Sequence, residues 1–113
     1  MTRIVMRESE ASFQSAVLQY AELHGWRTYH THDSRRSNPG FPDLVLVRDG
    51  VLIFAELKSE TGRVSPAQTE WLAALERVAQ CASGPAVDAV QAYVWRPRDW
   101  PQIEKVLTRR RST

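Results

Sequence analysis

The chain has 113 residues, of which 42% are hydrophobic and 25% are charged, and this balance indicates a globular domain rather than a disordered chain. The longest apolar run, residues 51–55, is far shorter than the ~20 residues that a membrane helix needs, and the polar residues 1–10 do not resemble a signal peptide. The formal net charge of +2 permits nucleic-acid binding without requiring it, and we expect a cytoplasmic protein.

The first predicted element is a helix that begins after an N-cap at Ser9 and ends before Gly25. Its apolar side chains recur at helical spacing, at Phe13, Ala16, Val17, Tyr20 and Leu23. Glu10 lies in the first turn, on the side that this spacing predicts to face the core. An acidic residue in a first turn also complements the helix macrodipole, so both interpretations of Glu10 stay open.

Residues 26–32 have the aromatic and threonine content of a strand, and the polar residues 33–40 then predict a loop. His30 and His32 share one face of that strand, with Asp33 next to them, but no closed set of four zinc ligands is visible. We therefore favour a structural or substrate-contacting role for these histidines. In the loop, Arg35 and Arg36 suit either phosphate contact or simple solvation.

A hairpin is predicted at the centre of the sequence. Residues 44–48 are almost purely apolar, Asp49-Gly50 is a strong turn signal, and residues 51–58 form the return strand. The return strand is apolar on both faces at its start, which predicts a central strand that is covered on both sides.

The end of the return strand contains residues that a buried strand rarely holds. Glu56 and Lys58 point to the same face, where a solvent-exposed pair is the simplest interpretation. However, counting outward from the turn places Asp43 opposite Glu56, with Cβ atoms ~5 Å apart, so the two carboxylates would repel. A divalent cation would remove this repulsion, and such oxygen ligands suit Mg²⁺. Lys58 then lies where it can stabilise developing phosphate charge or orient the attacking water.

A second helix is predicted to open at Ser65-Pro66. Its apolar stripe consists of Trp71, Leu72, Leu75, Val78 and Ala79. Gln68 lies on the same face, and it also completes a capping box with Ser65, so a purely structural role is open for it. The single cysteine, Cys81, excludes an internal disulfide, and we interpret it as a small buried hydrophobe at the end of this helix.

After a break at residues 83–85, residues 89–95 predict a strand, and Asp99 is expected to cap a last helix that contains Ile103, Val106 and Leu107. The order of elements predicts an α/β domain with a mixed sheet, in which the strands 51–58 and 89–95 run parallel. We expect one domain over residues 1–113, with a core at about 9–108 and a basic tail over 109–113 that either contacts phosphate or aids solubility.

Two groups of residues resemble a known family. Gly40-Phe41-Pro42-Asp43, followed by Ala55-Glu56-Leu57-Lys58, resembles the Pro-Asp…(Asp/Glu)-x-Lys nuclease superfamily. Its VRR-NUC branch in particular is similar in the flanking residues, Glu10-x-x-x-Gln14 before Gly25-Trp26 and Ser65-x-x-Gln68-x-x-Trp71-Leu72. The resemblance runs from about residue 10 to 95, although the chain has no Val-Arg-Arg triplet of the kind that names the family.

The resemblance implies a restriction-endonuclease-like mixed β-sheet flanked by α-helices. It also implies Mg²⁺ or Mn²⁺ held by Asp43, Glu56 and the backbone carbonyl of Leu57. Lys58 would work on the nucleophilic water, and Glu10 would support the metal site.

In the same resemblance Gln68 would orient Lys58 or contact substrate, while Arg35, Arg36 and Gln14 are candidate DNA contacts. Small stand-alone members, typically viral, are similar to Holliday-junction resolvases. A homodimer acting on branched DNA, in the host-cell cytoplasm if the source is viral, is therefore expected.

The sequence thus predicts a Mg²⁺- or Mn²⁺-dependent DNA endonuclease that selects its substrate by DNA structure. A general nicking or flap nuclease is the alternative within the same chemistry. A non-catalytic DNA-binding module of the same fold, and an unrelated α/β interaction protein with a chance motif, are the alternatives outside it.

Overall fold

The computed structural model describes residues 9–31 and 38–110, which form three α-helices and one four-stranded sheet in the order expected from the sequence. The helices are α1 (Glu10–Leu23), α2 (Pro66–Cys81) and α3 (Trp100–Thr108). The strands are β1 (Arg27–His30), β2 (Leu44–Arg48), β3 (Val51–Leu57) and β4 (Val90–Trp95), with short 3-10 turns at Gly84–Ala86 and Pro97–Asp99. Across the described ranges, none of the helices is both long enough and apolar enough to span a membrane.

The sheet has the strand order β1-β2-β3-β4, with antiparallel pairing up to β3 and parallel pairing between β3 and β4. Asp49 and Gly50 form the predicted turn, with positive φ of 50° and 78°, the conformation that a tight two-residue hairpin requires. Leu44 lies opposite Ala55, which is the register counted from the turn. The predicted α/β class with a mixed sheet, of the restriction-endonuclease-like kind, is confirmed.

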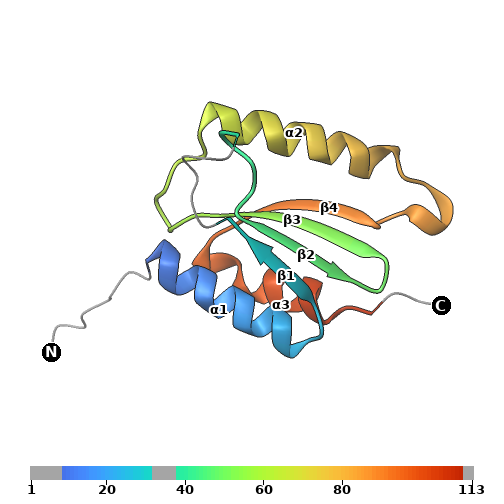
Figure 1. The fold of residues 1–113 in the computed structure, drawn as a ribbon, viewed down its shortest axis with the longest axis horizontal. Coiled ribbons are helices and arrows are strands. Elements are labelled where there is room, and N and C mark those ends of the chain that lie inside the picture. Colours follow the sequence, from blue (N-terminus) through green and yellow to red (C-terminus); the bar gives the residue numbers. More distant parts are fainter. Residues whose placement is uncertain (1–8, 32–37, 111–113) are drawn as a thin grey trace, which may run out of the picture.

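The helices cover the sheet from two sides (Figure 1): α2 lies on one face, and α1 and α3 lie on the other. Because side chains alternate along a strand, the pairing register assigns each strand residue to one face. The face toward α1 and α3 carries the core positions of β2 and β3, together with Trp95. We call the opposite face the α2 face, and its positions from β1 to β4 are residues 27, 29, 43, 45, 47, 52, 54, 56, 90, 92 and 94.

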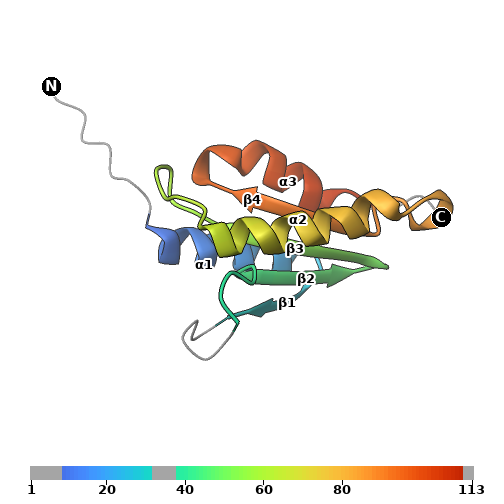
Figure 2. The same ribbon diagram turned by 90° about the horizontal axis from the view of Figure 1, so that it is seen from above.

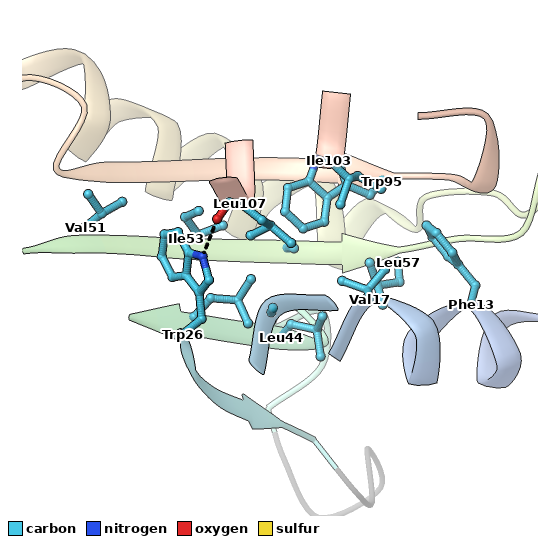
Figure 3. Close-up of a cluster of buried hydrophobic side chains, with 13 residues drawn as sticks. Phe13, Val17, Trp26, Leu44, Val51, Ile53, Leu57, Trp95, Ile103 and Leu107 are labelled. Atoms are coloured by element: carbon cyan, nitrogen blue, oxygen red, sulfur yellow. Dashed lines mark hydrogen bonds between the residues drawn. The ribbon is translucent and has the colours of Figure 1, made fainter. Parts of the chain in front are cut away.

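The hydrophobic core lies between the sheet and the pair α1 and α3 (Figure 3). Its buried residues are Phe13, Val17, Ala21, Trp26, Leu44, Leu46, Val51, Ile53, Ala55, Leu57, Trp95, Ile103 and Leu107. No described residue of α2 is fully buried, so that helix forms a thinner second layer on its side of the sheet. The prediction that β3 is covered on both sides is confirmed, but the layer formed by α2 contributes no fully buried residue, unlike the layer formed by α1 and α3.

Four details differ from the sequence prediction. Leu23, the last residue of α1, is 79% exposed, and the buried stripe of this helix is Phe13, Val17 and Ala21. Val78 is 55% exposed, since α2 packs against β4 mainly through its earlier turns. Cys81 is also exposed, so the prediction of a buried cysteine was wrong.

The fourth detail concerns Asp99. Its carboxylate accepts a hydrogen bond from the backbone N–H of Arg96 at 2.8 Å, and it makes no side-chain cap to α3. It stabilises the 3-10 turn that leads into the helix instead of the helix itself.

One buried cation ties the ends of several elements together. The Arg48 guanidinium donates to the carbonyls of His24 at 3.0 Å and Leu107 at 2.7 Å, and also to that of Arg109. It lies 4.4 Å from the ring centroid of Trp26, whose indole N–H donates to the same Leu107 carbonyl at 2.9 Å (Figure 3). Arg48 thereby satisfies carbonyls at the ends of α1 and α3 that have no partner within their helices.

Replacing Arg48 by methionine is expected to lower the free energy of unfolding by about 2–4 kcal/mol, because three carbonyls lose a charged donor. Urea unfolding followed by circular dichroism measures the change. Arg98→Met is the control: this side chain is 66% exposed, with its carboxylate partner 3.8 Å away, so its loss should change stability by less than about 1 kcal/mol. Equal losses in the two variants would contradict the structural role of Arg48.

Candidate active site

Asp43 and Glu56 lie at the end of the β2–β3 hairpin that is farthest from its turn. The ladder continues beyond Leu44, since the carbonyl of Asp43 accepts from the N–H of Thr31 at 3.1 Å. The Asp43 carboxylate accepts from the backbone N–H of Leu57 at 2.9 Å, which holds it across the hairpin. Glu56 is only 1% exposed, although it belongs to the thinly covered α2 face.

The electrostatics of Glu56 reflect this crowding. Burial, followed by hydrogen bonding to Asp43 and Coulombic repulsion from it, raises the pKa of Glu56 from 4.5 to about 9. Lys58 lowers that pKa and Glu10 raises it further. The buried Oε2 atom of Glu56 has no hydrogen-bond donor among the described residues. At neutral pH the carboxyl group therefore keeps its proton unless another cation takes the proton's place.

Gln68 connects α2 to this carboxyl. Its Oε1 atom accepts from the Ser65 N–H at 2.8 Å, and the Ser65 hydroxyl accepts from the Gln68 N–H at 3.2 Å, which completes the capping box. Its Nε2 atom donates to Oε1 of Glu56 at 3.2 Å. The oxygen of this amide therefore completes the helix cap, and its nitrogen contacts the Glu56 carboxyl. The predicted contact of Gln68 with Lys58 or substrate stays a prediction.

The segment before Asp43, residues 40–42, packs directly against the start of α2. Gly40 has a φ of +89°, and a Cβ atom there would overlap the carbonyl of Ala67 and lie 2.7 Å from the N atom of Gln68. Next to it, the Phe41 ring makes edge-on contacts with Phe54 of β3 and Trp71 of α2, at centroid distances of 5.9 and 5.1 Å. This close approach fixes the distance between the Asp43 segment and the helix that carries Gln68.

The loop that follows Lys58 is held by an arginine from another element. The backbone N–H of Lys58 donates to the carbonyl of Trp95 at 3.0 Å, which extends the parallel pairing with β4 by one step. The Arg96 guanidinium then donates to the carbonyls of Ser59 and Gly62, both at 2.7 Å. Neither the hydropathy pattern nor any motif pointed to Arg96, because its partners are backbone atoms far away in the sequence.

The remaining predicted site residues fall in three places. Glu10 is exposed, so the prediction that it faces the core was wrong; from the first turn of α1 its charge raises the pKa of Glu56. Gln14 is half-buried, and its amide nitrogen lies 3.5 Å from Nδ1 of His30, on the α1 side of the sheet. Further predicted residues lie outside the described ranges: His32, Asp33, Arg35, Arg36 and Arg111.

The residues present fit a hard divalent cation. Within residues 9–31 and 38–110, no three His, Cys, Asp or Glu side chains gather closely enough to form a ligand set by themselves. Asp43 and Glu56 supply two carboxylates, and the neighbouring Leu57 supplies a backbone carbonyl. Mg²⁺ is usually bound by one or two carboxylates plus waters and substrate phosphate, so two carboxylates suffice. The unpartnered oxygen of Glu56 is the observation that favours such an ion.

Comparison with known proteins gives one match. A family model described as the VRR-NUC domain matches residues 3–92, which include every described site residue from Glu10 to Gln68. No curated protein and no solved structure matches the chain.

Gly40→Ala is expected to lower the free energy of unfolding by about 2–4 kcal/mol, because the added methyl group meets the backbone of α2. Gly84→Ala is the matched control, since Gly84 also has positive φ, +57°, but a Cβ atom there meets nothing within 4 Å. It should cost only about 1–2 kcal/mol of backbone strain. Thermal unfolding compares the two, and an equal loss would show that the contact with α2 is unimportant.

The raised pKa of Glu56 predicts how stability depends on pH without metal. Between about pH 4.5 and 9 the folded state holds one more proton than the unfolded state, so the free energy of unfolding falls as pH rises through this window. Glu56→Gln removes this group, and at pH 8 in EDTA it should be more stable than wild type by about 1–3 kcal/mol. At pH 4.5 the two should be nearly equal.

Urea unfolding at both pH values measures the difference, with the exposed Glu76→Gln as the control for loss of one carboxylate. A wild-type chain that becomes more stable than Glu56→Gln as pH rises would contradict the raised pKa of Glu56.

Proposed function

This chain belongs to the VRR-NUC domain family and is a nuclease domain, and we propose that it is a divalent-metal-dependent endonuclease that hydrolyses phosphodiester bonds in DNA. The observation that supports this proposal most directly is the buried carboxyl group of Glu56 beside the half-buried Asp43. Glu56 could be buried here as a carboxylate only with a cation beside it, since burying an unpaired charge costs several kcal/mol, and no hydrogen-bond donor among the described residues reaches its Oε2 atom.

In the proposed site, Mg²⁺ or Mn²⁺ is held by Asp43, Glu56 and the Leu57 carbonyl, and Glu10 adds negative charge beside them. When bound, the ion lowers the pKa of a water molecule and offsets the charge of the scissile phosphate. Gln68 fixes the direction of the Glu56 carboxylate through its hydrogen bond to Oε1.

Lys58 is the proposed cation of the reaction itself. It follows Glu56 by two residues, so the alternation along the strand brings it to the same face, and its charge already acts on that carboxyl. From there its ammonium group orients the attacking water or stabilises the charge that develops on the phosphate. The hydrogen bonds from Arg96 hold the loop that follows Lys58.

We further propose that the enzyme selects DNA by its structure, as a resolvase-like homodimer acting on branched DNA. The single small domain offers few groups for reading base edges, so phosphate and shape recognition is the fitting mode. Gln14, Arg35 and Arg36 are the proposed further DNA contacts. A monomeric mass in light scattering at the working concentration would contradict the dimer.

The expected result of a cleavage assay is metal-dependent cutting that is lost with EDTA. Purified chain is incubated with a four-way junction, a flap, a single strand and a linear duplex, each with Mg²⁺, Mn²⁺ or EDTA. Lys58→Ala and Glu56→Gln should each reduce the cleavage rate by at least ~10³-fold, a loss typical of removing a group that acts on the transition state. Glu76→Gln, an exposed change of the same type on α2, should cut at the wild-type rate.

The substrate ranking then separates the subtypes. Preferred cutting of the junction supports the resolvase-like mode, and preferred cutting of the flap supports the flap nuclease. Cutting that survives in Lys58→Ala would reject the proposed catalytic set. A folded wild-type chain that cuts nothing with either metal would reject the enzyme and favour a DNA-binding module.

A further inference from the structure

The α2 face of the sheet is covered unevenly. Under α2 its β3 and β4 positions are half-buried, apart from the fully buried Glu56, whereas on β1 and β2 the side chains of Tyr29 and Val47 are 62% and 42% exposed. Arg27 is exposed beside them, and Val45 between them is half-buried. Figure 2 shows why: seen from above, α2 runs along the β3 side, and β1 and β2 lie clear of it. We call Arg27, Tyr29, Val45 and Val47 the open sheet face.

This open sheet face is continuous with the candidate active site. The pairing register places Tyr29 opposite Val45, and Arg27 opposite Val47. The carboxylate of Asp43 belongs to the next position along β2 on the same face, two residues from Val45. Measured along the strand direction at ~3.3 Å per residue, Tyr29 lies one row, roughly 7 Å, and Arg27 two rows, roughly 13 Å, from the row that holds Asp43 and Glu56.

The size of the open sheet face excludes a stable protein interface by itself. Two strands of this length cover on the order of 200 Å², whereas a stable complex buries about 800 Å² on each partner. The same strip is wide enough for one strand of nucleic acid.

The chemistry of the open sheet face also fits nucleic acid. Among its described positions on β1 and β2, the only charged side chain besides Asp43 is the cation Arg27. An exposed aromatic ring beside a cation is the usual combination for binding single-stranded nucleic acid, in which bases stack on the ring and phosphates pair with the cation.

We propose that the open sheet face binds the DNA strand that flanks the scissile phosphate, with Tyr29 stacked on an unpaired nucleotide and Arg27 paired with a phosphate further along. The proposal rests on the proposed nuclease function. It adds the surface that would contact the unpaired nucleotides of such a substrate next to the cleavage site.

The test measures DNA binding apart from cleavage. Every variant carries Lys58→Ala, and fluorescence anisotropy in Mg²⁺ follows binding to two labelled probes, a 30-base-pair duplex and the same duplex with two splayed single-stranded arms. Tyr29→Ala should weaken binding of the splayed probe about 10-fold and that of the duplex much less, as expected from ~1–3 kcal/mol of stacking per base. Tyr29→Phe, which keeps the ring, should restore binding to within about 2-fold.

Arg27→Gln should weaken binding of both probes and reduce the slope of log Kd against log salt by about 1, the signature of one lost phosphate contact. Arg27→Lys should recover most of that slope. Two exposed positions away from this face, Leu23→Ala on α1 and Arg77→Gln on α2, are the controls and should bind as the Lys58→Ala parent does. Circular dichroism establishes that each variant is folded.

Several results would overturn the proposal. One is unchanged binding of the splayed probe by Tyr29→Ala, and another is the absence of binding to either probe by the parent. A third is a change in mass by light scattering in Tyr29→Ala, which would identify the face as a contact between copies. If the wild-type chain cuts no DNA but binds the splayed probe in a Tyr29-dependent way, the nuclease function is rejected and DNA binding by the open sheet face is supported. The failure of one proposal is therefore distinguishable from the failure of the other.

Discussion

The arrangement of this domain depends on one carboxyl group that is buried where the sheet is most crowded. Glu56 lies at the end of a central strand, with Asp43 beside it and α2 above it. Its neighbours serve to hold it: Gln68 donates to one oxygen, the Leu57 N–H fixes Asp43, and Gly40 allows the preceding segment to approach α2. The second oxygen is left without a donor. In its charged form such a group destabilises a fold unless a proton or a cation binds to it, and that need connects the structure to the proposed chemistry.

Because a proton and a divalent cation compete for the same oxygen, the proposed site links folding, pH and metal. Without metal, the proton that Glu56 keeps removes the repulsion from Asp43. In the proposed enzyme, metal binding releases that proton, so metal affinity and pH are coupled. The two carboxyl groups thus have two stable arrangements, one with the proton and one with the metal, and the unsatisfied dianion is the arrangement that the fold disfavours.

The sequence predicted those features that depend on neighbours in the chain. Asp49-Gly50 set the hairpin turn, and the turn set the register that places Asp43 by Glu56. Contacts between distant segments left no local signal. The carbonyls bound by Arg48 and Arg96 belong to other elements, and the exposure of Val78 depends on which turns of α2 pack against the sheet. Gln68 stood between the two cases, because its cap is local and its bond to Glu56 is not.

The mixed sheet has a consequence for the order in which the chain assembles. Strands β2 and β3 are joined by two residues, so their pairing closes a very short loop, whereas β4 joins β3 only after the whole of α2 has crossed over. Local pairings form with a smaller loss of chain entropy than distant ones. We therefore expect the two carboxyl groups to meet early, while water still surrounds them, and to lose that water later when α2 docks. Opening of the α2 layer alone would hydrate the pair again without separating it.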